Sequence, residues 1–376
     1  MVDQSKRKFL TASAGAALLA SSSSVKDVVA APLKVRRIAT EEHFAFPEWF
    51  DAFNKLPASP GVRYLQIFYR NPEFIRKLND IDVRLAEMDS AGVDMQLLSL
   101  TGPGVQDFDA EQGTAVARLA NDRLAAIIKE HPGRFAGLAV VAPQDPKAAA
   151  AEVERAMTEL GLNGIIIYSY TQGEFLDDPK FWPIFDAAVK YRAPIYLHPD
   201  IPPDSMLEPF EKYNMVGALW GFQAECGLHV ARMILGGVFD HYPDLQIVLG
   251  HMGEGLPYWL FRLDDIFALL MGDEYAPAGR RARTGGQAPG MVRLKKRPSE
   301  YFLSNFHITT SGMFWNPTLD YCVKLLGVEK IIFAVDYPFE LSAAGTDWIM
   351  NHARLSPTDR AKILHGNAER VFRIKA

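Results

Sequence analysis

Cysteine is scarce in this chain of 376 residues, which contains only Cys226 and Cys322. Two cysteines can form at most one disulfide, and this pair lacks the CxxC spacing of a thiolate metal site. We therefore expect neither a disulfide framework nor a cysteine zinc site, and we interpret both residues as small core residues. Long apolar runs are missing too, because no stretch approaches the ~20 apolar residues that a membrane span needs.

A strong excess of one charge is also absent. The chain has 40 Lys and Arg against 45 Asp and Glu, a net charge of −5. Proteins that bind nucleic acids usually carry a basic excess, so we expect no nucleic-acid partner. The 48% hydrophobic and 23% charged residues are ordinary for a globular protein. The composition therefore predicts a globular chain that binds neither nucleic acid nor membrane.

The first 32 residues differ in composition from the rest. A basic segment is followed by the weakly apolar residues 11–20, a serine run and small residues at 29–31. This order is typical of an export signal and resembles a twin-arginine signal with lysine in the first paired position. The alternative is a disordered cytoplasmic tail. We expect residues 1–32 to be a leader and 33–376 a single domain, periplasmic if the leader is a signal and cytoplasmic otherwise.

Short apolar runs alternate with amphipathic segments along the rest of the chain. Repeated strand and helix units favour an α/β fold, a parallel (β/α)₈ TIM barrel. A doubly wound sheet is the alternative, but no glycine-rich phosphate loop follows the first run. The eight candidate strands are residues 35–40, 95–100, 135–141, 164–168, 194–198, 246–249, 306–309 and 331–335.

Three segments are too long to be simple connections. They are residues 44–77, which are rich in aromatic side chains including Phe46, residues 200–221 and residues 268–299. On a barrel all three leave the C-terminal ends of strands, so we expect them to cover the mouth, where long loops are usually functional. The basic run at 279–286 within the third segment is equally compatible with a solvated surface loop.

Metal-ligand residue types gather at the ends of the candidate strands. Glu41 and His43 follow the first run and share one face of an extended chain, because they are two residues apart. His198 ends the fifth run and Asp336 follows the eighth, while His251 lies just after the sixth. Strand ends of a barrel converge at one mouth, so we predict a metal site there.

Two carboxylates and two imidazoles suit one divalent ion, Zn²⁺ or Mn²⁺, better than a soft copper site. The sequence does not separate the two metals. The alternative for each histidine taken singly is a capping or core residue. Glu42 is adjacent to the ligands but faces the opposite way, and we interpret it as structural.

Four motifs follow one another along the chain. They are Glu-Glu-His-Phe-Ala at 41–45, Leu-Gly-His-Met-Gly-Glu-Gly-Leu-Pro-Tyr at 249–258, Phe-His-Ile-Thr-Thr-Ser-Gly at 306–312 and Asp-Tyr-Pro-Phe-Glu at 336–340. In this order they resemble the motifs of the amidohydrolase-related decarboxylases. The resemblance covers residues 35–372 and is strongest to the γ-resorcylate and 2,3-dihydroxybenzoate decarboxylases, which are related to aminocarboxymuconate-semialdehyde decarboxylase.

The resemblance implies roles for several residues of this chain. It implies that Glu41, His43, His198 and Asp336 bind one divalent ion. It also makes His251, supported by Glu254, an acid–base group, with Asp336 or its partner delivering a proton.

The resemblance also points to substrate contacts. Arg262 matches a family arginine near the substrate, although a helix-surface arginine is equally compatible with the sequence. Tyr168 stands where the resorcylate enzymes carry an asparagine near the substrate. Phe46 belongs to the aromatic segment expected to close over the ring.

Together with the resemblance, these residues predict non-oxidative decarboxylation of a hydroxylated aromatic carboxylic acid. The small-molecule acid is the expected partner, and we expect a homo-oligomer, a dimer or tetramer. A single-metal hydrolase of an ester, lactone or amide would use the same site with a metal-bound hydroxide. A catalytically silent binding protein on the same barrel is the third possibility, and turnover separates it from both enzymes.

Overall fold

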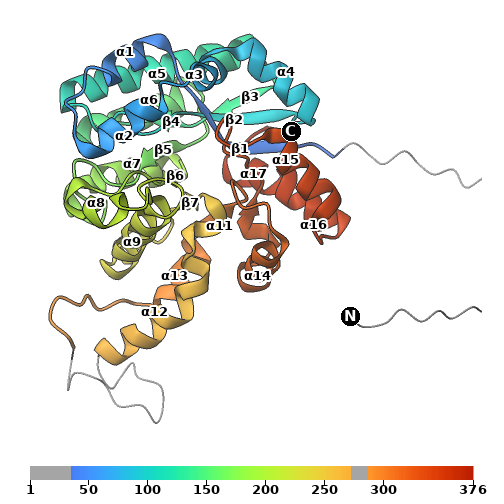
Figure 1. The fold of residues 1–376 in the computed structure, drawn as a ribbon. Coiled ribbons are helices and arrows are strands. Elements are labelled where there is room, and N and C mark those ends of the chain that lie inside the picture. The colour runs from blue at the N-terminus through green and yellow to red at the C-terminus, as the bar shows by residue number, and fades with distance from the viewer. Residues whose placement is uncertain (1–34, 272–286, 376) are drawn as a thin grey trace, which may run out of the picture. The chain divides into compact units, whose positions relative to one another are not determined.

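The computed structural model describes residues 35–271 and 287–375, so the predicted leader and the basic run at 279–286 lie outside the described residues. Parallel strands form the centre of this part of the chain, and Figure 1 shows helices arranged around them. The strands are β1 (Ile38–Phe44), β2 (Met95–Leu100), β3 (Phe135–Gly137), β4 (Ala139–Val140), β5 (Ile165–Tyr168), β6 (Ile195–His198), β7 (Ile247–Leu249), β8 (Phe306–Thr309) and β9 (Ile331–Ile332).

The strands close into a ring. Hydrogen bonds join β1, β2 and β3 in one sheet and β4 to β9 in order in another. Leu138 separates β3 from β4 by one residue, and its N–H donates to Leu98 O at 2.8 Å, so these two strands are halves of one strand. The ring closes where His43 N–H donates to Tyr337 O at 2.8 Å, just after β9. The predicted (β/α)₈ barrel is confirmed.

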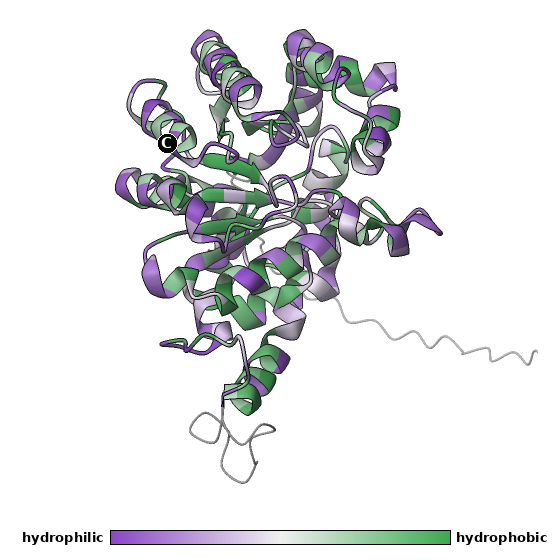
Figure 2. Cartoon of the chain, turned by 90° about the vertical axis from the view of Figure 1, so that its left-hand side faces the viewer, coloured by the Kyte–Doolittle hydropathy of each residue, from purple (hydrophilic) through white to green (hydrophobic). Residues whose placement is uncertain are grey.

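The strands are apolar because both of their faces are covered. Every residue of β5, β6, β7 and β8 is buried. Parallel strands in this situation read as continuous apolar runs, which is why they stood out in the sequence. Figure 2 shows the hydrophobic strands at the centre and hydrophilic residues on the outer faces of the helices.

Side-chain caps fix where several of the outer helices begin. Asp109 accepts a hydrogen bond from Gln112 N at the start of α5, and Asp145 does the same for Ala148 N at the start of α6. The helices are α1 (Pro47–Phe53), α2 (Pro60–Phe68), α3 (Pro72–Asn79), α4 (Ile81–Ala91), α5 (Ala110–Glu130), α6 (Pro146–Thr158), α7 (Trp182–Tyr191), α8 (Asp204–Glu211), α9 (Gly221–Leu235), α10 (Val238–His241), α11 (His251–Glu254), α12 (Leu256–Met271), α13 (Pro298–Asn305), α14 (Asn316–Leu326), α15 (Ser342–Asp347), α16 (Pro357–Ala361) and α17 (Asn367–Val371).

One predicted boundary, the end of the first strand, was wrong. The first strand does not end at Thr40 but runs on through Phe44, because Glu41, Glu42 and His43 find buried partners that hold them in the barrel wall. Residues 44–77 are largely helical, as α1, α2 and α3. In the described part of the chain, no helix has both the length and the apolar character to cross a bilayer.

Candidate active site

Four of the predicted ligands meet at the C-terminal mouth of the barrel. Glu41 and His43 come from β1, His198 ends β6, and Asp336 follows β9. One ligand atom from each of the four lies within 4.8 Å of the others. Strands that are far apart in sequence therefore present two carboxylates and two imidazoles to a single point.

Glu41 is held on one side only. Its Oε2 accepts hydrogen bonds from the hydroxyls of Tyr196, Thr309 and Ser311, that of Thr309 at 2.9 Å. Its Oε1 is buried and has no hydrogen-bond partner among the described residues. Burial raises the pKa of Glu41, and the positive charge of His251 opposes that rise. The carboxylate is thus oriented by three hydroxyls, with one oxygen left for a cation.

His198 is oriented in the complementary way. Its Nδ1–H donates to Pro199 O at 2.7 Å, which leaves the lone pair on Nε2. This Nε2 is buried without a hydrogen-bond partner in the described residues and lies 3.4 Å from Glu41 Oε1. Burial and the neighbouring His43 lower the pKa of His198 to about 3. The imidazole is therefore neutral, which is the form that binds a metal.

His43 and Asp336 complete the cluster. His43 Nε2 lies 3.1 Å from Asp336 Oδ1. Burial would raise the pKa of Asp336, but hydrogen bonds from His251 and His43 outweigh it and hold that pKa below its usual range. Asp336 also has a φ of +80°, a strained backbone for a non-glycine residue, and such strain concentrates at functional sites.

The cluster fits a divalent cation on its own chemistry. Two buried atoms without protein partners, Glu41 Oε1 and His198 Nε2, face each other, and leaving such atoms unpaired inside a protein is costly. Carboxylate oxygens and imidazole nitrogens are ligands that zinc and manganese both accept. Glu41, His43, His198 and Asp336 would hold the ion.

His251 lies beside the ligands on an unusual turn. From His251 to Gly255 every residue has a positive φ, between 49° and 81°. The turn brings His251 Nδ1 to 2.6 Å from Glu254 Oε1 and its Nε2 to 3.6 Å from both Glu41 Oε1 and Asp336 Oδ2. A Cβ on Gly250 would lie 2.7 Å from Glu41 Oε1, so glycine is required where this turn leaves β7.

Charge partners keep His251 protonated. Burial alone would lower its pKa, but the carboxylates of Glu254 and Glu41 raise it well above the usual value. Glu254 holds Nδ1, so Nε2 is the atom that points to the metal cluster. An imidazolium with its Nε2–H at the reaction site can donate a proton.

A cavity of about 300 Å³ opens over this cluster. This volume lies at the lower end of the range for small-molecule sites. Three aromatic side chains, Phe68, Phe74 and Phe339, pack against one another in its wall with centroids 5.0 to 5.8 Å apart. The complete lining is Tyr64, Leu65, Phe68, Tyr69, Phe74, Gly102, His198, Pro199, Asp200, Gly217, Ala218, Phe222, His251, Asp336, Phe339 and Glu340.

The three predicted substrate contacts lie outside this lining. Phe46 is buried in the core below α1, 4% exposed, with the Arg123 guanidinium 5.1 Å from its ring centroid. Tyr168 is fully buried beneath the ligands, where its hydroxyl donates to Leu100 O and lies 3.2 Å from His43 Nδ1. Arg262 is exposed on α12 and lines a separate apolar groove with Trp259. Their roles in substrate binding stay predictions.

The sequence did not single out the hydroxyls that orient Glu41. Tyr196 precedes His198 by two residues and so faces the same side of β6, which is a signal that could have identified it. Thr309 and Ser311 belong to the Phe-His-Ile-Thr-Thr-Ser-Gly motif at 306–312. Their hydroxyl groups donate hydrogen bonds to Glu41, so these two residues act by orienting that carboxylate and do not line the cavity.

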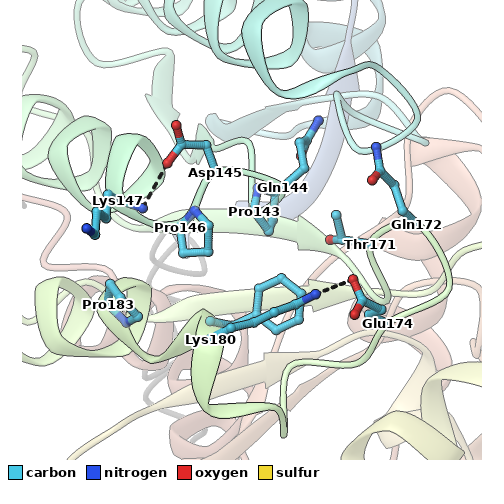
Figure 3. A pocket seen from close by; sticks show the side chains of 11 residues that line it. Pro143, Gln144, Asp145, Pro146, Lys147, Thr171, Gln172, Glu174, Lys180 and Pro183 are labelled. Carbon is cyan, nitrogen blue, oxygen red and sulfur yellow. Dashed lines mark hydrogen bonds and ion pairs between the residues drawn. The ribbon is translucent and has the colours of Figure 1, made fainter.

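A second cavity of similar size lies elsewhere on the barrel, between the segment before α6 and the segment before α7. It has about 310 Å³ and shares no lining residue with the metal-site cavity. Figure 3 shows Lys180 paired with Glu174 and Asp145 turned to the start of α6. These charged groups are engaged with one another or with the backbone, and the titratable cluster lies in the other cavity.

The fold and this cluster define a metal-dependent enzyme of the amidohydrolase type. The Amidohydrolase family matches residues 69–374 of the chain, and the chain belongs to this family. His198, His251 and Asp336 lie inside the matched range, and β1 with Glu41 and His43 precedes it. The resemblance inferred from the four motifs is confirmed.

Named relatives narrow the class further. The chain is 35% identical to γ-resorcylate decarboxylase from Rhizobium sp., over 90% of this chain and 98% of that protein. It is 42% identical to 5-carboxyvanillate decarboxylase from Sphingomonas paucimobilis, with a TM-score of 0.84, over 91% of this chain and all of that one.

A third similar structure carries a metal. The 5-carboxyvanillate decarboxylase from Novosphingobium aromaticivorans, complexed with manganese and 4-hydroxy-3-methoxy-5-nitrobenzoic acid, is 39% identical with a TM-score of 0.83, over 90% of this chain and 96% of that one. Together with the four-residue cluster, this confirms the predicted cofactor, one divalent ion. The chain is a decarboxylase of the amidohydrolase superfamily.

Proposed function

We propose that this protein catalyses non-oxidative decarboxylation of an aromatic acid that bears a hydroxyl group ortho to the carboxylate. The observation that carries the proposal is the His251–Glu254 pair beside an oxygen and nitrogen ligand cluster, under a cavity walled by aromatic rings. Similar proteins named as decarboxylases of γ-resorcylate and 5-carboxyvanillate support it.

Glu41, His43, His198 and Asp336 would hold the ion. When bound, the ion supplies Lewis-acid stabilisation of negative charge on substrate oxygens and a template for their position. Tyr196, Thr309 and Ser311 fix the Glu41 carboxylate, and Pro199 O fixes the His198 ring. This second layer keeps both ligands in one orientation without rearrangement on binding.

Protonation of the ring carbon is the step that this chain's own residues perform. His251 holds a proton on Nε2, 3.6 Å from Asp336 Oδ2. Asp336 can pass that proton to the substrate carbon, or His251 can deliver it directly. Loss of CO₂ then restores the aromatic ring. Glu254 keeps His251 charged before the transfer and lets it recover a proton afterwards.

The cavity wall has a second role, the exclusion of water. Phe68, Phe74 and Phe339 line the cavity, and Phe339 also packs on His43 with ring centroids 5.4 Å apart. A dry site strengthens the electrostatic interactions of the ligands and of His251 with a bound anion.

The test is a mixed panel of hydroxybenzoates, esters and lactones incubated with manganese-loaded enzyme and read by mass spectrometry. The proposal predicts loss of CO₂ from an ortho-hydroxybenzoate. Addition of water to an ester or lactone, with every hydroxybenzoate unchanged, would replace it with the single-metal hydrolase. Manganese is proposed over zinc because a similar structure contains it. Elemental analysis after metal-limited expression with each ion decides between them.

We further propose that the enzyme is a homo-oligomer, a dimer or tetramer. Three large side chains of α12 are exposed to solvent, Tyr258 (72% exposed), Trp259 (52%) and Phe261 (80%). An apolar patch of this kind on a folded chain is typical of an interface. Sedimentation velocity of the wild type and of Phe261→Glu tests it, with a monomer in both cases contradicting the proposal.

The leader is proposed to be an export signal of twin-arginine type, which would place the mature protein in the periplasm. The basic, apolar and small-residue order of residues 5–31 supports it. N-terminal sequencing of protein from its native host decides the point. A mature start near Pro32 is expected, and an intact start in cytoplasmic protein would show that the leader is only a tail.

A further inference from the structure

Another cavity, of about 580 Å³, lies at the opposite end of the barrel from the metal ligands. Pro194 and Gln246 line it and directly precede β6 and β7, so it lies at the N-terminal ends of the strands. The metal ligands lie at the other ends, and the two cavities share no lining residue. The volume is within the range of small-molecule sites, and catalysis on barrels takes place at the C-terminal face. The proposed reaction therefore makes no use of this cavity.

Three arginines and one carboxylate line this N-terminal cavity. Arg192 follows the end of α7, Arg370 lies on α17, and Arg373 follows that helix. The carboxylate is that of Asp244. All four side chains are exposed, so they are accessible to a ligand in solution. Three positive charges against one negative charge favour an anion that carries two negative charges.

Neutral oxygen atoms hold two of these arginines in place. Arg370 Nη2 donates to Glu329 O at 2.6 Å and to Asn367 Oδ1 at 3.2 Å, and Arg373 Nη2 donates to Tyr191 O at 3.1 Å. Carbonyl and amide oxygens orient a guanidinium without neutralising its charge. Each guanidinium has five N–H donors, and these contacts use only one nitrogen of each group. Both arginines are thus oriented and still able to bind an anion.

A buried histidine belongs to the same wall. His307 on β8 lines the cavity and is 3% exposed, and its Nδ1 has no hydrogen-bond partner among the described residues. Leaving a buried polar atom unpaired is costly. Burial and the positive charges of Lys330 and Arg370 lower the pKa of His307 to about 3, so the ring is neutral. An anion in the cavity would offer an acceptor to the N–H of this ring and offset the charges around it.

The rest of the wall is largely apolar and suits an organic group. The apolar residues are Ala188, Val189, Ala193, Pro194, Leu245 and Val371. A phosphate monoester carries close to two negative charges at neutral pH, and its oxygens match the paired N–H groups of a guanidinium. We propose that this cavity binds a small organic phosphate, with the phosphate group on the three arginines and His307 and the organic group on the apolar residues. The site is independent of the proposed reaction.

The test compares phenyl phosphate with phenyl sulfate, which has a similar shape but only one negative charge. Binding is measured by calorimetry with manganese-loaded full-length enzyme, at about pH 7.5 and about 0.15 M salt to screen non-specific attraction. Phenyl phosphate is expected to bind at least about tenfold more tightly than phenyl sulfate. Equal affinity for the two compounds, or no binding of phenyl phosphate, would overturn the proposal.

Two charge-reversed variants locate the bound phosphate, because binding at the metal would give the same calorimetric signal. Arg192→Glu is expected to weaken phenyl phosphate binding at least about tenfold. Arg63→Glu makes the same change in charge on α2, next to Tyr64 and Leu65 in the wall of the metal-site cavity, and should leave the affinity unchanged. Unchanged affinity in Arg192→Glu, or an equal or greater loss in Arg63→Glu, would contradict the assignment to the N-terminal cavity.

His307 is tested with two uncharged replacements. His307→Leu removes an unpaired polar group, so the Tm is expected to stay the same or rise, while the affinity for phenyl phosphate falls at least about threefold. His307→Gln keeps an N–H donor and is expected to bind more tightly than His307→Leu. Unchanged affinity in His307→Leu, or an equal loss in both variants, would show that the ring of His307 does not contact the phosphate.

Discussion

Glu41 Oε1 and His198 Nε2 lie 3.4 Å apart, and neither atom has a hydrogen-bond partner in the described part of the chain. The rest of each side chain is tied down, Glu41 by three hydroxyls and His198 by Pro199 O. Two oriented, buried and unsatisfied ligand atoms that face each other are what a metal site requires before the ion binds.

Replacing His198 should remove the ion. In His198→Ala we expect metal content to fall from about one ion per chain to near zero, because the open Nε2 is lost. His352→Ala, at an exposed histidine far along the chain, is the matched control and should keep its metal. Elemental analysis of purified protein gives the answer, and full occupancy in His198→Ala would contradict the ligand assignment.

Glu42 is adjacent to the predicted metal ligand Glu41 in the sequence, but its contacts indicate a structural role. Its Oε1 accepts from Val335 N at 3.0 Å and its Oε2 from Tyr337 N at 3.3 Å, so it ties β1 to the segment after β9. Glu42→Gln should keep about one ion per chain but lower the Tm, because an amide group cannot accept both hydrogen bonds. Loss of the metal with an unchanged Tm would make Glu42 part of the site.

His251 should affect turnover without affecting metal content. Removing a positioned acid–base group typically costs a factor of about 10² to 10⁴ in rate, so His251→Asn should lose activity on this scale with the ion retained. Glu254→Gln should retain part of the activity but lose it at lower pH than the wild type. The reason is that Glu254 raises the pKa of His251, and without it the imidazolium is lost earlier as pH rises. If the activity of Glu254→Gln falls at the same alkaline pH as that of the wild type, Glu254 does not have this role.

Glu225 on α9 predicts a pH dependence of stability. It is fully buried, and burial raises its pKa to about 8, against hydrogen bonds from Ser169 and the Asp200 backbone. The folded state therefore binds this proton more tightly than the unfolded state. Its contribution to stability is complete below the carboxyl pKa of the unfolded chain and is lost as pH rises through about 8.

The amide side chain in Glu225→Gln cannot ionise, so this variant should not lose the stability that the wild type loses as pH rises. The Tm of the variant relative to the wild type is expected to rise steadily between pH 5 and pH 9, as measured by calorimetry. Glu130→Gln, at an exposed position, should show a constant difference over the same range. A constant difference in Glu225→Gln would mean that the carboxyl group stays ionised or stays protonated throughout.

The barrel and its ligands could be predicted because both leave local signals. Strands with two covered faces appear as apolar runs, and the C-terminal ends of parallel strands must converge. His198 and Asp336 were identifiable for this reason, and so was the turn that carries His251. The extension of β1 through His43 was not, since three adjacent polar residues normally end a strand. They remain in the wall only because their partners, such as Tyr337 and Ser99, come from elsewhere in the chain.

The cavity wall was less predictable than the ligands. The aromatic segment after β1 was expected to cover the mouth, and Phe68 and Phe74 do line the cavity, whereas Phe46 turns into the core. Which face of a short helix meets the barrel depends on tertiary packing, and α1, α2 and α3 are each under ten residues long. The surroundings of Arg262 could not be predicted for the same reason, because the local sequence does not show which neighbour α12 packs against.

The most direct test of the central claim is the reaction run in D₂O with manganese-loaded enzyme and an ortho-hydroxylated benzoate, with the product examined by mass spectrometry and NMR. The account predicts release of CO₂ and one deuterium at the vacated ring carbon, with neither seen in His251→Asn or in metal-free protein. A product that has gained the elements of water and kept its carboxylate, or CO₂ release at an unchanged rate after the metal is removed, would contradict it.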